Sequence, residues 1–307
     1  MNGFGASQLI GMLLTLGVIT AVGIRSGRHV KSAADFSTGG GRAGSLIVAG
    51  SLMGTLVGGA ATIGTAQLAY TNGFSGVWFT LGAGLGCLAL IFFAGPLRHS
   101  GCKTLQQILT REYGEAAGLL ASLLGVLGLF IAIVAQVLSA TALLGSLVRL
   151  PLFACAFVSV LLMLCYVLFG GVWGAGLVGA IKTALLYVSV LTAGVLVLTR
   201  AGGFDALHAA LPDAQYFNVF SRGIGHDGGE GLSMIFGVLS TQTYAQSVFA
   251  GRDEPTVRRG LIASALLIPP IGVGGVLVGL YMRLDAPGIP SAQVFPQFVL
   301  RTMPGAF

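Results

Sequence analysis

The chain has 307 residues, of which only 8% are charged and 55% are hydrophobic, and its formal net charge is +6. A soluble domain carries about 25% charged residues, so this composition excludes a water-facing surface of ordinary size. The basic residues lie between apolar runs, as they do in membrane proteins. We therefore expect the lipid bilayer as a partner and no nucleic acid.

Long apolar runs predict an all-α, polytopic membrane helix bundle of about eight spans. A spanning helix needs about 20 apolar residues, whereas barrel strands would be near 10 residues and would alternate. Lipid offers no hydrogen bonds to the backbone, and helices satisfy their own. The expected spans are residues 8–24, 45–70, 75–96, 117–147, 152–170, 177–199, 231–250 and 260–282.

Two links between these spans have features of their own. Residues 104–113 are amphipathic and should lie along the membrane interface. The long link 200–230 is acidic, and we expect a solvated loop with a short helix at 203–211. The four cysteines show no paired spacing, so we expect neither a disulfide nor a resident cofactor.

The distribution of basic residues predicts a multi-pass protein of the cell membrane with its N-terminus outside. Cytoplasmic links carry an excess of lysine and arginine. One alternate set of links holds five basic residues: Arg149, Arg200, Arg222, Arg283 and Arg301. The other set, which we assign to the cytoplasm, holds ten: Arg25, Arg28, Lys31, Arg42, Arg98, Lys103, Arg111, Arg252, Arg258 and Arg259.

The second span contains many residues that weaken a helix. Between Gly50 and Thr62 it holds four glycines and three hydroxyl residues, and each glycine costs a helix about 1 kcal/mol relative to alanine. One interpretation is a packing face of small residues that lets another helix approach closely. The other is a broken helix whose freed carbonyls and helix ends bind ion and substrate. Composition alone favours neither.

Several motifs resemble the sodium:solute symporter family. The first is Asp35-Phe36-Ser37-Thr38-Gly39-Gly40-Gly41-Arg42, similar to that family's acidic-aromatic-Gly-Gly-Arg link but one residue longer. The segment from Ala49 to Gly64 resembles the family's broken second helix. The remaining matches are Thr104–Leu109 with Arg111–Gly114, Gly170–Trp173, Gln242 and Gln246 with Arg252–Arg259, and Val294–Pro296 to Met303–Pro304. Their shared order along the whole chain carries the resemblance.

The resemblance implies a leucine-transporter-like fold, in which two inverted five-helix repeats follow one extra span. We expect one transmembrane transporter domain over 1–307, with the extra span and its link in 1–44. The first repeat would occupy 45–200, and the second would start within 231–307. Family members continue beyond the position of Phe307, so we expect an apparently truncated transporter domain that lacks part of the sodium site.

The resemblance also implies a sodium site at the broken helix. Sodium is a hard cation that takes oxygen ligands, and carbonyls released where a helix unwinds need a partner. Carried over by position, the backbone carbonyls of Gly54 and Val57 would supply half of the site. The alternative is an unbroken span in which Gly54 only packs.

A solute should lie beside the break, near the middle of the membrane. The candidate contacts on the second and seventh spans are Ala61, Thr62, Gln67, Thr241, Gln242, Tyr244 and Gln246. Glutamine is costly in lipid unless paired, so the alternative role is hydrogen bonding between helices. Neither stretch carries a charge, which weighs against a solute held there by a salt bridge.

One lysine departs from the family pattern. Related members often have an acidic residue in the sixth span, one turn before a glutamine, whereas this chain has Gly179 and Lys182. If the span begins at Leu177, Lys182 lies roughly 8 Å from the interface at 1.5 Å per residue, and its stem could snorkel to the surface. Alternatively it points into the bundle near Gly54 and Val57, where its ammonium would replace sodium or carry a proton.

We expect a secondary active transporter that couples a small-molecule solute to sodium by alternating access. HExxH, GxSxG and paired intramembrane aspartates do not occur, and the glycine runs lack the strand–helix context of a phosphate loop. We therefore expect no enzymatic activity. The alternatives are a transporter-like sensor domain of a signalling protein, proton-coupled transport through Lys182, and an inert fragment. The pattern specifies neither the solute nor the oligomeric state.

Overall fold

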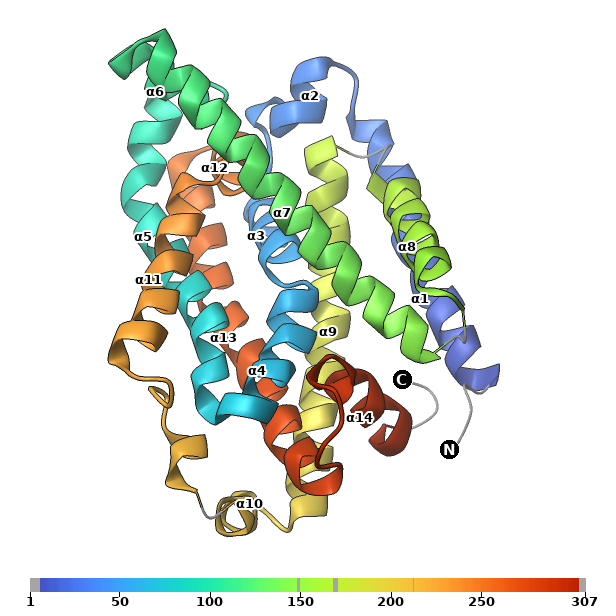
Figure 1. Cartoon of the computed structure of the whole chain (residues 1–307). Helices are drawn as coiled ribbons and strands as arrows, with labels where there is room; N and C mark the ends of the chain where they lie inside the picture. Colours follow the sequence, from blue (N-terminus) through green and yellow to red (C-terminus); the bar gives the residue numbers. More distant parts are fainter. Residues whose placement is uncertain (1–5, 148–149, 168–170, 212, 304–307) are drawn as a thin grey trace.

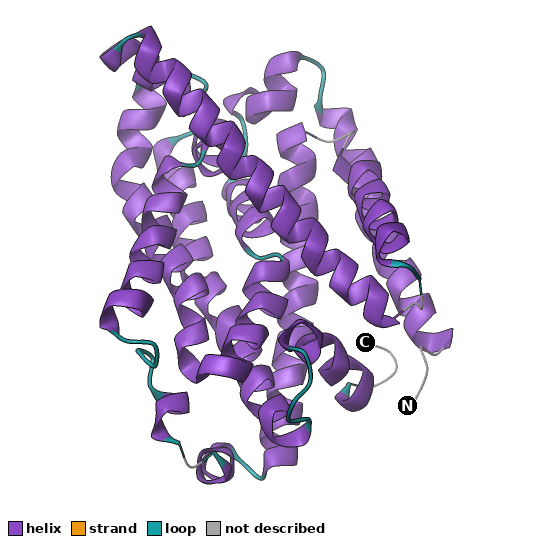
Figure 2. Cartoon of the chain, viewed as in Figure 1, coloured by secondary structure: helices purple, strands orange, loops and turns teal. Residues whose placement is uncertain are grey.

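Helices and their connections make up the part of the chain that the computed structural model describes (Figure 2). That part comprises residues 6–147, 150–167, 171–211 and 213–303. Within it, the β-type pairing is one isolated parallel bridge between Ala43 and Gly251. The prediction of an all-α bundle is therefore confirmed.

The helices differ widely in length. The longer ones are α1 (Ala6–Ser26), α3 (Ser45–Leu56), α5 (Trp78–His99), α7 (Glu115–Leu147), α8 (Leu152–Val167), α9 (Gly171–Ala201), α11 (Ile224–Ser240) and α13 (Glu254–Asp285). The shorter ones are α2 (Ala33–Thr38), α4 (Thr65–Asn72), α6 (Leu105–Tyr113), α10 (Phe204–Ala210), α12 (Gln242–Ala250) and α14 (Val294–Thr302). A π-helical turn, Ala60–Gly64, leads into α4.

Long apolar helices identify a multi-pass membrane protein. Five described stretches are long and apolar enough to cross a bilayer: Ile10–His29, Ala60–His99, Glu115–Gly145, Gly171–Ala201 and Glu254–Asp285. The second and seventh expected spans are each divided into two shorter helices, and half a span cannot cross a bilayer alone. The total of eight spans is compatible with this arrangement and stays a prediction.

The centre of the bundle is formed by α3, α5, α9 and α13, while α1, α7 and α8 lie at its periphery (Figure 1). Leu52, Leu90 and Ile268 are fully buried in this centre. Large apolar side chains on α7, such as Leu123 and Phe130, are about 60% exposed (61% and 62%). Such exposure of large apolar side chains is favourable in lipid and unfavourable in water.

Glycines hold α3 against α9. A Cβ built at Gly54 would lie 2.7 Å from the Cα atom of Gly179, and one built at Gly179 would collide with the carbonyl oxygen of Gly50. Gly176 packs equally closely on Ile47, where a Cβ would lie 2.8 Å from the carbonyl oxygen. The packing-face interpretation of the second span is therefore correct for the residues before the break.

The basic links meet at one end of the bundle, which we call the basic end; α2, α6 and the α12–α13 turn lie there (Figure 1). The Ala43 N–H donates to the Ala250 carbonyl at 2.9 Å, and the Arg252 N–H donates to the Ala43 carbonyl at 3.0 Å. Arg98 donates to the carbonyls of Gly251 and, at 2.9 Å, Arg252. These contacts bring together three of the links that the charge count groups.

The opposite end is closed by segments around α10 and α14 (Figure 1). There Arg222 pairs with Asp227 at 2.6 Å and with Glu230. Asp227 is fully buried at the start of α11, so its charge requires this partner.

Helix boundaries confirm some expectations and correct others. The short helix at 203–211 and the helix within 104–113 are present as α10 and α6. The sixth span was predicted to begin at Leu177, but α9 begins at Gly171. Glycines in this first part of α9 pack on α3 and α1, and such packing overrides weak helix propensity.

Candidate functional site

The second span breaks, as predicted, between Gly54 and Gly59. The last regular bond of α3 runs from the Val57 N–H to the Met53 carbonyl at 2.8 Å. Val57 then leaves helical geometry, with φ −92° and ψ 83°. The chain resumes as the π-helical turn from Ala60 and continues as α4. The carbonyl of Gly54, next after Met53, is therefore free for a partner outside the helix.

Lys182 supplies that partner. Its Nζ atom donates to the Gly54 carbonyl oxygen at 2.7 Å. The snorkelling interpretation is wrong, and its error lies in the start of the span. Since α9 begins at Gly171, Lys182 lies roughly 16 Å along the helix at 1.5 Å per residue. The close packing of Gly179 on Gly54 then directs the lysine stem into the bundle.

A second side chain satisfies the other exposed backbone group at the break. The Gly59 N–H donates to Oε1 of Gln136, on α7, at 3.0 Å. A Cβ at Gly58 would lie 2.7 Å from the same amide group, and one at Gly59 would lie 2.8 Å from Oγ of Ser139. The absence of side chains at Gly58 and Gly59 therefore lets α7 pack directly against the break. Gln136 is not among the site residues predicted above, although a lone glutamine within the apolar run 117–147 is a usable signal.

The seventh span, predicted above as one continuous segment, is interrupted as well. α11 ends at Ser240, Thr241 is extended with φ −87° and ψ 127°, and α12 begins at Gln242. The backbone groups of Thr241 are bonded locally: its N–H donates to the Gly237 carbonyl at 3.1 Å, and its carbonyl accepts from Tyr244 at 3.2 Å. The polar run from Ser240 to Thr243 within an apolar span is the signal for this joint.

A buried contact joins the two interrupted spans. Oγ of Ser247, on α12, donates to Oγ of Ser51, on α3, at 3.0 Å. On α12, the Thr243 hydroxyl oxygen is buried and has no hydrogen-bond partner within the described residues. A buried hydroxyl without a partner carries an energetic cost, so Thr243 is an additional candidate for contact with a ligand.

The predicted solute contacts on the second span remain near the break. Ala61 and Thr62 are buried on the π-helical turn, where the Thr62 hydroxyl donates to the Gly58 carbonyl at 3.1 Å. Gln67 is partly exposed one turn further on, in α4. These three residues therefore follow one another away from the break along a single chain segment.

Both glutamines of the seventh span bond to links at the basic end. Oε1 of Gln242 accepts from the Leu105 N–H at 2.8 Å. Nε2 of Gln246 donates to the Ser37 carbonyl, in α2. Tyr244 lies between them and packs partly buried against the central core. Bonding between segments accounts for these two glutamines, and their contact with a solute stays a prediction.

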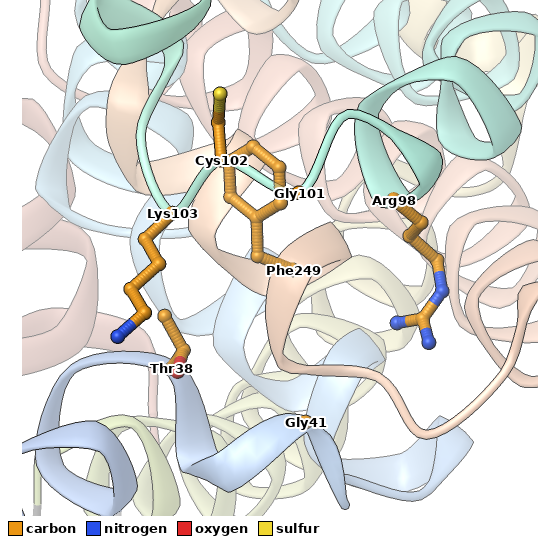
Figure 3. A pocket seen from close by; sticks show the side chains of 7 residues that line it. All are labelled: Thr38, Gly41, Arg98, Gly101, Cys102, Lys103 and Phe249. Atoms are coloured by element: carbon orange, nitrogen blue, oxygen red, sulfur yellow. The ribbon is translucent and has the colours of Figure 1, made fainter.

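A cavity of about 170 Å³ opens at the basic end (Figure 3). Its lining consists of Thr38, Gly41, Arg98, Gly101, Cys102, Lys103 and Phe249. Two cationic side chains flank the opening, but the Arg98 guanidinium is bonded to backbone carbonyls. The lining includes none of the predicted solute contacts, so this cavity is separate from the break.

Two interrupted helices inside a bundle of apolar helices are typical of the leucine-transporter-like class of membrane proteins. The sequence profile described as "Sodium:solute symporter family" matches residues 36–296. The chain belongs to the sodium:solute symporter family.

Relatives extend this match. The chain is 27% identical over 197 residues to "Uncharacterized symporter YwcA" of Bacillus subtilis (strain 168), a stretch covering 62% of the chain and 37% of that protein. It is 23% identical over 294 residues to human "High affinity choline transporter 1", covering 91% of the chain and 50% of the transporter. The chain thus spans half or less of these curated relatives.

A solved structure has the same fold. A substrate-bound, outward-open Na⁺-coupled sialic acid symporter superposes with a TM-score of 0.86 at 19% identity. The superposition covers 99% of this chain and 67% of the symporter. The leucine-transporter-like fold that the motifs imply is therefore confirmed.

One of the two predicted sodium ligands, the Gly54 carbonyl, fits a bound sodium poorly. Gly54 and Val57 lie at the break, as the family pattern implies. The Gly54 carbonyl, however, already accepts a hydrogen bond from a cationic ammonium group at 2.7 Å. A sodium ion on the same oxygen would lie beside a like charge, which disfavours its binding.

Proposed function

We propose that the native protein containing this chain is a secondary active transporter that moves a small solute by alternating access. The family membership and the interruption of α3 at Val57 carry this proposal. Half helices present unpaired backbone groups at the middle of the membrane, where solutes bind in such folds. The second interruption, at Thr241, divides the seventh span in the same way.

The proposed solute site lies between the π-helical turn and the α11–α12 joint. Its candidate contacts are Ala61, Thr62, Gln67, Thr241, Gln242, Tyr244, Gln246 and, in addition, Thr243. These two segments carry no formal charge. We therefore expect a solute recognised by hydrogen bonds and apolar contact. Choline and sialic acid, from the names of the similar transporters, are the first probes.

Coupling to a sodium gradient is proposed from the family and from the sodium-coupled symporter of the same fold. The native gene product in proteoliposomes should accumulate a labelled solute above equilibrium under an inward sodium gradient. Ala61→Trp should abolish uptake, because a large ring would fill the break, whereas Leu120→Trp, on the exposed face of α7, should leave uptake intact. Equilibration without accumulation under every ion gradient would contradict secondary active transport.

The orientation of the protein is a separate proposal. The count of ten basic residues against five supports a cytoplasmic basic end and an external N-terminus. In a cysteine-free background, an impermeant thiol reagent applied to intact cells should label a cysteine placed at Asp213 but not one placed at Glu254. The reverse labelling pattern would contradict this topology.

A further inference from the structure

At the break in the second span, side chains of the protein itself bond to two of the backbone groups that leave the helical pattern. Lys182 reaches the Gly54 carbonyl from α9, and Gln136 accepts the Gly59 N–H from α7. A carbonyl freed in lipid needs a donor or a cation. The Lys182 ammonium meets both needs of the Gly54 carbonyl, because it donates hydrogen bonds and carries a positive charge.

Close helix packing sets the position of this ammonium. Lys182 lies one turn after Gly179, whose backbone is in direct contact with Gly50 and Gly54 of α3. Because the two backbones already touch, α9 cannot move closer to α3. The stem of Lys182 therefore leaves α9 directly beside the broken end of α3.

No carboxylate competes for this lysine within the described part of the chain. The ion pairs observed there involve link or helix-end residues, and none includes Lys182. The ten acidic residues of the whole sequence fall outside the ranges 36–111 and 116–204. The ammonium therefore bonds to a neutral carbonyl oxygen, the partially negative end of the C=O dipole. A bound metal cation would use the same oxygen as a ligand.

We propose that Lys182 is a tethered cation that permanently takes the place of a coupling sodium ion at the Gly54 carbonyl. The inference rests on the proposed function for the expectation that a coupling ion exists. It adds that any such ion binds elsewhere in the protein. Lys182 is a positioning residue, because its bond to the Gly54 carbonyl holds the broken end of α3 against α9.

The stoichiometry of sodium binding tests this assignment without any transport measurement. The purified, detergent-solubilised native gene product is titrated with ²²Na⁺, and the saturable retention per molecule is compared between wild type and Lys182→Ala. Removal of the ammonium frees the Gly54 carbonyl and leaves space beside it. We expect the variant to bind one more sodium ion per chain than the wild type.

Two further variants make the comparison specific. Lys103→Ala removes a lysine that lines the basic-end cavity and should leave the sodium stoichiometry unchanged. Lys182→Ser is the reserve variant if size-exclusion chromatography shows that Lys182→Ala does not fold. Its short side chain carries a ligand oxygen, and it should also bind one more sodium ion than the wild type.

Equal stoichiometry in wild type and in a folded Lys182 variant would overturn the proposal, whether both proteins bind sodium or neither does. A gain of one ion in Lys103→Ala as well would also overturn it, because the effect would then follow net charge. Failure of solute accumulation in proteoliposomes would contradict the proposed function alone and would leave the stoichiometry result standing.

Discussion

The two interrupted spans satisfy the hydrogen bonds of their freed backbone groups in different ways. At the first break, between α3 and α4, the freed groups of Gly54 and Gly59 are bonded by side chains from α9 and α7. At the second, Thr241 is one extended residue whose own N–H and carbonyl are bonded within α11 and α12. Buried backbone groups must be paired in either case.

The first break is stabilised by contacts between residues distant in the sequence, and the second by hydrogen bonds within its own flanking helices. The first break depends on residues distant in the sequence, so its geometry requires the bundle to be assembled. The second depends on bonds that its flanking helices make themselves, while its glutamines reach out to the basic end. We therefore expect substitutions in remote helices to disturb the first break more than the second.

The largest effect should come from the seam beside the first break. Gly179→Ala introduces a Cβ that collides with the Gly50 carbonyl, and forcing apart a packed interface typically costs about 1–3 kcal/mol. Gly128→Ala, on α7, has nothing within 4 Å of the added atom and is the matched control. Thermal unfolding in detergent should show a lower midpoint for Gly179→Ala and an unchanged midpoint for Gly128→Ala. Equal midpoints would contradict the close seam.

Loss of the glutamine at the first break should have the next largest effect. Gln136→Leu leaves the Gly59 N–H without its side-chain acceptor, and an unsatisfied buried donor costs about 1–3 kcal/mol. Hydrogen exchange of the amide at Gly59 should speed up together with a lower unfolding midpoint. Unchanged exchange at this amide would show that another group supports the break.

The equivalent change near the second break should be milder. Gln242→Leu removes the acceptor of the Leu105 N–H at the start of α6, but Thr241 keeps its local bonds. A net loss of about 0.5–1.5 kcal/mol is expected, as for one ordinary hydrogen bond. Exchange should increase at Leu105 and not at Tyr244. Faster exchange at Tyr244 would contradict local support of the second break.

The smallest effect is expected in α2, to which Gln246 of the seventh span is bonded. Hydrogen bonding from Ser32, with Arg42 at 2.5 Å, holds the pKa of Asp35 below its ordinary value. A depressed pKa contributes stability above the unfolded value of about 4, and this contribution disappears as the pH falls through the folded pKa.

The unfolding midpoints of wild type and Asp35→Asn should therefore differ at pH 6 and converge toward pH 3. The exposed Asp205→Asn serves as control and should follow the wild type throughout. A difference between wild type and Asp35→Asn that grows toward acidic pH would contradict the assigned direction.

Much of the architecture could be predicted because hydropathy and helix weakness are local properties. The apolar runs specified membrane helices, since lipid tolerates no unpaired backbone. The cluster of glycines after Gly50 located the first break correctly. The order of short motifs identified the family that the profile match over 36–296 confirms.

Tertiary structure alone decided which side chain meets which backbone group. The start of α9 depended on glycine packing against α3, and that start determined whether Lys182 reached the surface or Gly54. Gln136 became part of the break because α7 crosses it, which no local pattern encodes. Composition indicates where a helix is weak, whereas the partner of each freed group is set by helices that pack there from distant parts of the chain.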